Sequence, residues 1–323
     1  NPSSSKPRRK NHYLMMNCIG IHITAYRDRG AMERSLKMAL AQTLTPAEIR
    51  IVDNSPTPLF STSPSQGVAY CCSGSNLGTA GAINASIRYW QEHRAVDFIW
   101  ILDQDSEPAP ELLAELMNFF QRECKANADP IAAVAPLTRN RDNRQINHPM
   151  TFDRWRPRKV PLSGHGAGVA AELIPAAGML IHLPTIRRCT LPTDRYFLDC
   201  YDFALGRAFI KIGARCLVAT GIELSHQVGS TRTVKASGLS YKFDDAPPAR
   251  IELRYRNETY LYTREAAGFD KSIATLSAFW RAACKSFFYL RLIKHIGWRK
   301  VIAPIKGYLL GLFSLAPSNR KTS

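Results

Sequence analysis

The sequence predicts an α/β fold, in which helices flank both faces of a mostly parallel, twisted sheet and a C-terminal helical region follows. Short apolar runs of strand length alternate with segments of helical periodicity as far as residue 136, and this alternation is typical of parallel sheets. The chain has 323 residues, 45% of them hydrophobic, which is enough to bury a full core.

The first elements alternate regularly. Residues 18–24 form a mostly apolar run and predict a buried strand, and residues 32–44 repeat apolar side chains at helical spacing. Short runs over 48–52 and 68–72 predict the second and third strands.

The same alternation continues to the last predicted strand. The glycine-containing segment 76–81 precedes a helix predicted over 82–93, which leads into the apolar run 98–102. A helix over 111–123 and a strand over 131–136 complete the series. Ligands of such sheets bind at the carboxyl ends of the strands, so the residues that follow each strand are the first candidates for a site.

Changes in composition divide the chain into regions. Segment 138–168 lacks periodicity and is rich in Arg, Asn, Pro and Gly, so it predicts a long loop that is functional or mobile. We expect a flexible basic tail over 1–15, the α/β domain over 16–240, and a basic, amphipathic helical region over 241–323.

The cysteines and the apolar segments indicate a cytoplasmic protein. The eight cysteines include the adjacent pair Cys71-Cys72 but no Cys-x-x-Cys pair, so they match neither a disulfide framework nor a zinc site. The basic N-terminus is not followed by a secretory apolar region. No run of 18 uncharged apolar residues occurs, so we expect no spanning helix.

The formal net charge of +17 requires an anionic partner: nucleic acid, anionic lipid or a nucleotide-linked substrate. Much of it lies in 271–306, where apolar residues recur at helical spacing and the one acid, Asp270, stands at the border. Such a helix either lies in a membrane surface or packs on the main domain with a solvated charged face. The further apolar segment 308–313 favours contact with an anionic membrane.

The motif Asp103-Gln104-Asp105-Ser106 directly follows the apolar run 98–102. Its two carboxylates would project from the carboxyl end of a buried strand, where open α/β sheets bind ligands. Carboxylate and pyrophosphate oxygens are the ligands that Mg²⁺ or Mn²⁺ prefers, so the motif predicts a metal ion holding a nucleotide diphosphate. Alternatively, the two acids cap a helix that begins near Glu111.

The phosphate-binding glycine motifs of other nucleotide enzymes are missing from the sequence. There is no G-x-x-x-x-G-K-[ST], and no G-x-G-x-x-G follows the first strand. This argues against a P-loop enzyme and against a dehydrogenase.

Several motifs together resemble a known family. They are Asp53-Asn54-Ser55, the Asn-Leu-Gly-x-Ala-Gly-Ala-x-Asn stretch over 76–84, Asp103-Gln104-Asp105-Ser106, and the downstream segments 177–181, 197–202, 225–229 and 255–257. In this order they resemble family 2 glycosyltransferases of the GT-A fold, and they are most similar to bacterial rhamnosyltransferases. The resemblance spans about residues 18–260 and implies a GT-A catalytic domain over 16–240.

The resemblance implies roles in binding a nucleotide sugar. Thr24, Tyr26 and Asp53 would hold the nucleobase and ribose, although a turn or helix-cap role for Asp53 stays open. Asn76 and Gly78 would lie beside the pyrophosphate, where a residue without Cβ lets the backbone approach.

The resemblance also implies a metal site. Asp103 and Gln104 would lie at the nucleotide sugar, with Asp103 near the metal, and Asp105 would ligate Mg²⁺ or Mn²⁺ directly. His226 would complete the site, and an imidazole suits Mn²⁺ better than Ca²⁺. Taken alone, a histidine at this position is more often a satisfied core or surface residue than a metal ligand.

The implied catalytic base is Asp202, with Asp199 as its competitor. The family pattern has an acid two positions after the base and an arginine six after it, whereas this chain has Ala204 and Ala208 there and Arg207 one place short.

Further implied contacts lie with the reacting sugars and the phosphates. Gly178 lies where donor and acceptor sugars approach, and Arg250 and Arg256 would contact diphosphate or a lipid-linked acceptor. As alternatives, these residues belong to ordinary strand packing and to the solvated surface of a basic protein.

Taken together, these features predict an inverting, metal-dependent transferase at the inner face of a bacterial cytoplasmic membrane. It would move rhamnose from dTDP-L-rhamnose to a lipid-linked or polysaccharide acceptor, and UDP-galactofuranose is the alternative donor. A nucleic-acid-binding protein is a second class of function, but the sequence contains no recognised reading module for it. An inactive scaffold with the same fold is a third. The oligomeric state is not encoded in any of these motifs.

Overall fold

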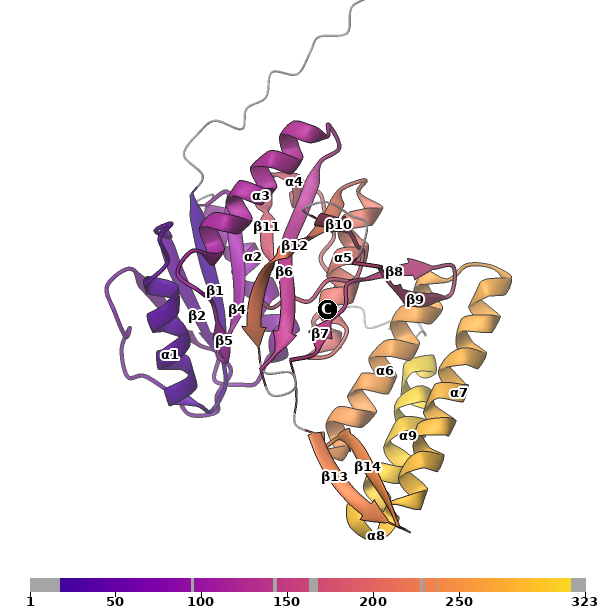
Figure 1. The fold of residues 1–323 in the computed structure, drawn as a ribbon. Helices are drawn as coiled ribbons and strands as arrows, with labels where there is room; N and C mark the ends of the chain where they lie inside the picture. The colour runs from indigo at the N-terminus through magenta and orange to yellow at the C-terminus, as the bar shows by residue number, and fades with distance from the viewer. Residues whose placement is uncertain are drawn as a thin grey trace, which may run out of the picture.

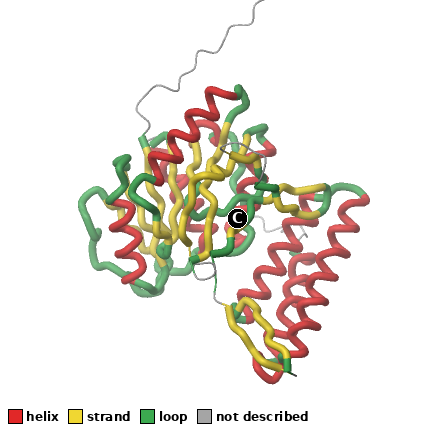
Figure 2. The backbone as a smooth tube through the Cα atoms, viewed as in Figure 1, coloured by secondary structure: helices red, strands yellow, loops and turns green. Residues whose placement is uncertain are grey.

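The computed structural model describes residues 18–93, 96–141, 144–162, 168–226, 229, 231–236 and 238–314. Within these residues a ten-stranded sheet flanked by helices forms the main domain (Figures 1 and 2). Three long C-terminal helices and a small hairpin lie beside it, below and to the right in Figure 1.

Four parallel strands form the first half of the sheet. They are β1 (Ile19–Ala25), β2 (Glu48–Asp53), β3 (Val68–Cys72) and β4 (Phe98–Asp103). β1 lies between β2 and β4, and β3 extends the sheet beyond β2. All four strands lie where the apolar runs predict them, because buried parallel strands need continuous apolar sequence.

The second half of the sheet mixes directions. β11 (Leu180–His182) runs antiparallel between β4 and β6 (Ile131–Asn140), and β12 (Arg215–His226) runs parallel to β6. β10 (Gly168–Ala170) is the antiparallel edge strand. The mostly parallel α/β sheet that the sequence predicts is confirmed.

Helices cover both faces of the sheet. One apolar core lies under α2 and α5, and a second core lies under α1 and α3 on the other face. α1 begins earlier than predicted because the Asp28 carboxylate accepts a hydrogen bond of 2.9 Å from the Ala31 N–H and so caps the helix. The helices of the domain are α1 (Arg29–Leu40), α2 (Gly78–His93), α3 (Leu112–Ala126), α4 (Leu183–Ile186) and α5 (Tyr201–Lys211).

The expectation of one long loop over 138–168 is wrong for the described part of that segment. It contains the end of β6, the two-residue strand β7 (Ile146–Asn147), and the hairpin β8 (Met150–Asp153) with β9 (Arg156–Lys159). These strands have two to four residues each, so even the alternation Met150-Thr151-Phe152-Asp153 in β8 is too short to mark a strand in the sequence.

The C-terminal region is helical, as predicted. The hairpin of β13 (Thr231–Ala236) and β14 (Leu239–Asp244) precedes it, so the division predicted at residue 240 falls inside β14. The helices are α6 (Pro248–Glu265), α7 (Phe269–Arg291), the short α8 (Ile293–Ile296) and α9 (Trp298–Phe313).

Two glycines bring α9 close to α6. A Cβ on Gly307 would lie 2.2 Å from the carbonyl oxygen of Glu252, and one on Gly311 would lie 2.6 Å from the carbonyl oxygen of Arg256. The two backbones therefore touch directly, because a side chain at either position would separate the helices.

We expect Gly307→Ala to lower the free energy of unfolding by about 1–3 kcal/mol, the usual range for overpacking. The added methyl would press on the backbone of Glu252, which has no rotamer to change. Thermal denaturation measures the effect. Gly221→Ala is the control, since a Cβ there would meet nothing within 4 Å, and an equal loss in both variants would contradict the prediction.

Candidate active site and metal centre

The turn after β4 aims two carboxylates at the carboxyl edge of the sheet. The backbone N–H of Asp103 donates to the Ser106 hydroxyl at 3.0 Å, which closes the turn. α3 begins only at Leu112, and its N-cap residue Glu111 makes no side-chain cap bond. The two aspartates are therefore not helix caps, and that alternative is excluded.

A short strand, β5 (Ser106–Glu107), brings the third group to this turn. β5 pairs antiparallel with the end of β12, and Ser106 stands opposite His226. His226 is thus held beside a turn that lies 120 residues earlier in the chain. β5 could not be predicted from the sequence, since two residues carry no periodicity.

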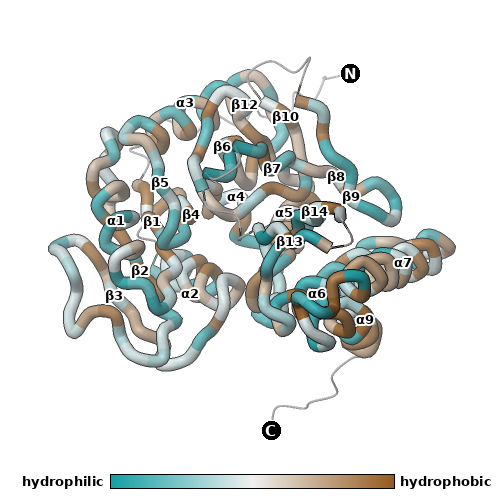
Figure 3. Tube along the Cα trace, turned by 60° about the horizontal axis from the view of Figure 1, so that its bottom comes forward, coloured by the Kyte–Doolittle hydropathy of each residue, from teal (hydrophilic) through white to brown (hydrophobic). Residues whose placement is uncertain are grey.

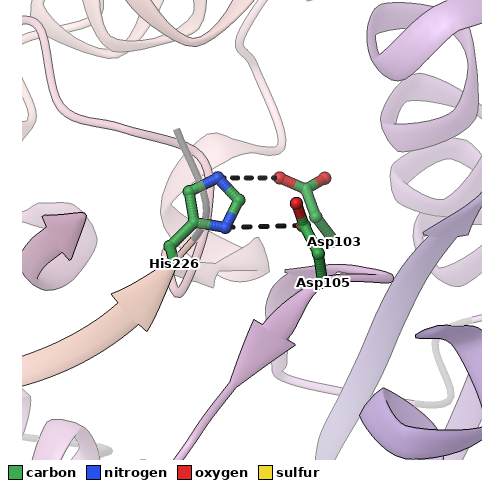
Figure 4. A group of neighbouring side chains, drawn as sticks. All are labelled: Asp103, Asp105 and His226. Carbon is green, nitrogen blue, oxygen red and sulfur yellow. Dashed lines mark ion pairs between the residues drawn. The ribbon is translucent and has the colours of Figure 1, made fainter. Parts of the chain in front are cut away.

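Asp103, Asp105 and His226 form a cluster that can hold a divalent metal. Their ligand atoms all lie within 4.8 Å of one another. His226 Nε2 is 3.8 Å from Asp103 Oδ2, and His226 Nδ1 is 3.5 Å from Asp105 Oδ1, with both carboxylates turned toward the ring (Figure 4). Among the described residues, no other group of three or more His, Cys, Asp or Glu side chains has its ligand atoms this close together.

The surroundings of the cluster fit a cation. His226 Nδ1 is buried and has no hydrogen-bond partner in the described part of the chain. Burial raises the pKa of Asp103, His226 lowers it, and the negative charge of Asp105 raises it again. A cation would offset this repulsion, and the set of two oxygens and one nitrogen suits Mg²⁺ or Mn²⁺.

A pocket of about 290 Å³ joins the cluster to the second group of acids. Asp103 and His226 line it from the sheet, and Asp199 and Asp202 line it from the start of α5. Its other walls come from α6, the start of α2 and small residues before β11; they include Arg250, Arg254, Glu258, Thr79, Ala176 and Ala177.

Asp202 lies in the first turn of α5 and is only partly exposed. Burial raises its pKa to about 7, although hydrogen bonds from the backbone N–H groups of Phe203 and Ala176 act in the opposite direction. The nearby Asp199 raises it further. A carboxylate with a pKa near neutrality can accept and release a proton at the working pH of an enzyme.

Asp199 has different partners. Its Oδ1 is 3.4 Å from Arg250 Nη2 and 3.8 Å from Arg254 Nε. Both arginines are on α6, one helical turn apart, and point to the same side of the helix. Asp199 is therefore engaged in ion pairs, whereas Asp202 has none among the described residues.

Residues 20–173 match the family model of glycosyl transferase family 2. This segment is slightly less than half of the chain. The chain has a glycosyltransferase domain. The matched segment includes Asp103 and Asp105, while Asp199, Asp202 and His226 lie beyond its end.

A solved structure of a mannosyltransferase has a similar fold. The mannosyltransferase PcManGT from Pyrobaculum calidifontis, in complex with GDP-Man and Mn²⁺, has a TM-score of 0.51 and 15% identity over 92% of this chain and 87% of its own. TarS from S. aureus has a TM-score of 0.49 and 12% identity over 80% of this chain. The matched part covers 41% of the length of the TarS chain. At these identities the likeness concerns the GT-A fold alone. The comparison with curated proteins gave no match.

In this glycosyltransferase, Gln104 fixes the backbone of Tyr26. Its side-chain oxygen accepts from the Tyr26 N–H at 2.7 Å, and its amide donates to the Tyr26 carbonyl at 3.1 Å. Thr24 is bound to the His22 ring at 2.8 Å. Gln104 therefore shapes the loop after β1, a contact that its position in the motif did not reveal.

Asp53 is fully buried. Its carboxylate accepts hydrogen bonds from the backbone N–H groups of Ser55 and Leu59 and from the Tyr70 hydroxyl at 2.5 Å. Burial by itself would raise the pKa of Asp53, but these hydrogen bonds lower it below the usual range. These contacts match the turn role of Asp53, which was the alternative to its role in binding the nucleobase.

The glycines predicted at the site are needed for packing. Gly78 has φ +66, and a Cβ there would lie 2.0 Å from the Phe197 carbonyl oxygen. Asn76 accepts from the Gly78 N–H at 2.9 Å and so shapes the same turn. Gly178 has φ +82, and a Cβ there would lie 2.7 Å from the ring of Pro136. Each glycine holds together the segments that carry the pocket.

The arginines divide into two groups. Arg250 lines the pocket, whereas Arg256 lies outside it and donates to the Arg195 carbonyl and to the Asn257 side chain. Arg207, which stands one place short of the arginine in the family pattern, pairs with Glu172 and Glu265 away from the pocket. It therefore contributes to the packing of the domain. Arg254 was not among the residues predicted from the sequence, although its i, i+4 spacing from Arg250 on a helix was a usable signal.

Proposed function

We propose that this glycosyltransferase inverts the anomeric centre of its donor and uses Asp202 as the catalytic base. The observation that carries the proposal is the pocket that joins Asp202 to the cluster of Asp103, Asp105 and His226. A base and a diphosphate-binding centre on the same pocket are the two requirements for direct displacement at a sugar carbon.

The residues act in one step. Asp202 accepts the proton of the acceptor hydroxyl as that oxygen forms its bond to the anomeric carbon, while the bond from this carbon to the diphosphate oxygen breaks. Asp103, Asp105 and His226 would hold Mg²⁺ or Mn²⁺, which supplies positive charge to the departing diphosphate when bound. Arg250, with a buried Nε that has no hydrogen-bond partner among the described residues, adds a second cation at the pocket.

Asp199 is the alternative base, and its partners argue against that role. A base must release its carboxylate to the acceptor hydroxyl, whereas Asp199 is bound by Arg250 and Arg254. We therefore assign Asp199 a positioning role, in which it orients the two arginines toward the pocket.

We propose dTDP-L-rhamnose as the donor, on the strength of the motifs over 76–84 and 103–106. With this donor and Mn²⁺ present at about 100 times Kd, ligand linkage stabilises the fold by about 2.7 kcal/mol. Thermal-shift measurements with dTDP-, UDP- and GDP-sugars should therefore give the largest shift for dTDP-rhamnose, and EDTA should reduce it.

The same panel separates the alternatives. A larger shift with UDP-galactofuranose would replace the donor and keep the reaction. No shift with any nucleotide sugar, with or without Mn²⁺, would overturn the assignment of this pocket as the donor site. NMR of the product then reports whether the anomeric configuration is inverted.

The proposed acceptor is a lipid-linked saccharide or a polysaccharide at the inner face of the cytoplasmic membrane. The net charge of +17 supports an anionic surface as partner. In the described part of the chain, no helix combines the length and the apolarity that crossing a bilayer requires. The proposed contact is therefore peripheral.

A further inference from the structure

We propose that the outer face of α7 and α9, together with the basic tip formed by α8 and the β13–β14 hairpin, binds the surface of an anionic bilayer. We call this face and tip the docking surface. The inference gives the proposed membrane contact a defined location, and its test does not depend on sugar transfer.

The docking surface holds most of the exposed apolar side chains. Of the thirteen large hydrophobic side chains that are exposed in the described residues, eleven lie in 269–313. They come from α7 and α9: Phe269, Leu276, Phe279, Trp280, Phe287, Leu290, Trp298, Ile302, Leu309, Leu310 and Phe313. A patch this large is unusual on a soluble monomer and marks an interaction site.

The apolar side chains lie opposite the packed face of α7. Ala278 and Ala282 are buried against Tyr308 of α9. Trp280 and Phe287, seven residues apart and therefore on one side of the helix, are 61% and 59% exposed. α7 is thus apolar on two opposite faces, and only one of them is covered by the fold.

α9 repeats this arrangement beside α7. Gly307 and Gly311 face α6, while Ile302 and Phe313 are exposed. The two helices lie side by side, and brown, hydrophobic segments run along both in Figure 3. The two exposed faces therefore form one apolar region about two helices wide.

Unpaired cations gather at one end of this region. The hairpin packs on the end of α7, where the rings of Tyr241 and Phe288 are 6.0 Å apart. Six exposed basic residues of the hairpin, α7, α8 and α9 form no ion pair within the described chain: Arg232, Lys235, Lys242, Arg291, Lys294 and Arg299. Trp298 lies among them, and Arg291 sits 5.0 Å from the Phe287 ring centre.

This combination selects an anionic bilayer over a second copy of the chain. Aromatic and aliphatic side chains next to Lys and Arg suit the headgroup layer, where rings enter the interface and cations meet phosphate. A second copy would bring another chain of charge +17 toward the same cations, and like charges at an interface oppose association.

α6 lies between the pocket and the two helices that carry the docking surface. Arg250, Arg254 and Glu258 of α6 line the pocket, while Tyr255 of the same helix packs toward α7 and α9. Arg281 of α7 reaches through to Glu258 at 2.9 Å. A bilayer bound to the outer face of α7 and α9 would therefore lie about two helix diameters, roughly 20 Å, from the residues that line the pocket, close enough to present a lipid-linked acceptor.

Vesicle flotation tests the inference. The native chain should float with vesicles of equal parts phosphatidylcholine and phosphatidylglycerol and remain largely unbound with phosphatidylcholine alone. The double variant Trp280→Ser/Phe287→Ser and the triple variant Arg291→Gln/Lys294→Gln/Arg299→Gln should each bind at least about tenfold less, because both apolar insertion and charge contribute. Thermal denaturation confirms that both are folded.

Controls use the same substitutions elsewhere on the surface. Leu40→Ser, at an exposed residue of α1, and Lys37→Gln should float like the native chain. Equal flotation of the native chain and both multiple variants would overturn the proposal. A native dimer in light scattering that the Trp280→Ser/Phe287→Ser variant dissociates would also overturn it and assign the face to a second copy. If donor binding fails but flotation follows this pattern, the docking surface stands without the proposed function.

Discussion

Asp202→Asn should lower kcat by about 10²- to 10⁴-fold, the usual contribution of a positioned general base. An amide keeps the shape of the side chain but cannot accept the acceptor proton. Donor binding should change little, because the metal cluster and Arg250 are untouched. Initial rates at saturating donor and isothermal titration with the nucleotide sugar measure the two quantities.

The pH profile of the native enzyme gives an independent readout. Because burial raises the pKa of Asp202 to about 7, the active carboxylate form increases as the pH rises through neutrality. The kcat/KM value should therefore rise with pH and level off above about pH 7 to 8. The Asp202→Asn variant should lose this limb of the profile.

The same substitution should stabilise the fold at alkaline pH. The folded pKa of Asp202 lies above its unfolded value, so the folded state binds more protons between about pH 4 and 7 and loses stability as the pH rises through that window. An asparagine cannot ionise, so the variant should have the higher Tm at about pH 8, and the gain should vanish near pH 4.

Asp199→Asn is the matched control for Asp202→Asn. It removes a charge bound by Arg250 and Arg254, so it should lower the Tm instead of raising it. Full activity of Asp202→Asn together with inactivity of Asp199→Asn would assign the base to Asp199. Full activity of both would remove general-base catalysis from this pocket.

Asp105→Ala should remove Mn²⁺ binding and lower kcat/KM by roughly 10³-fold. Charge stabilisation by a bound cation contributes several kcal/mol in the transition state, and each 1.4 kcal/mol changes the rate about tenfold. In this variant only Asp103 and His226 remain as metal ligands, and two ligands are too few for a stable site. Titration of Mn²⁺ followed by electron paramagnetic resonance measures binding without any substrate.

Asp129→Ala is the control, because Asp129 is an exposed acid on the loop before β6. It should bind Mn²⁺ as the native chain does. Unchanged Mn²⁺ affinity in Asp105→Ala would mean that the cluster of Asp103, Asp105 and His226 is not the metal centre, whatever happens to the rate.

The parallel half of the fold was predictable because its strands are buried on both faces. The run 98–102 in the sequence became β4 (Phe98–Asp103), and the carboxylates after it lie at the sheet edge as expected. The hairpin β8–β9 was not predictable, because its strands have only four residues each and its packing involves a distant helix, with the rings of Phe152 and Tyr262 5.9 Å apart.

The candidate site was predictable only in part for a related reason. Asp103, Asp105, His226, Asp202 and Arg250 were all singled out from the sequence, and the structure brings them to one place. The pocket is lined by four of them: Asp103, His226, Asp202 and Arg250. The sequence shows the residue types but not their hydrogen bonds. It could not show that Asp53 and Gln104 bind backbone groups of nearby turns, or that Arg256 binds the Arg195 carbonyl outside the pocket.

The two-residue strand β5 ties the candidate metal cluster to the register of two distant segments. His226 faces the aspartates only when β12 is in register with Ser106, and a slip of one residue would turn the imidazole to the opposite side of the sheet. Only one alignment of these two segments therefore brings the three candidate metal ligands together.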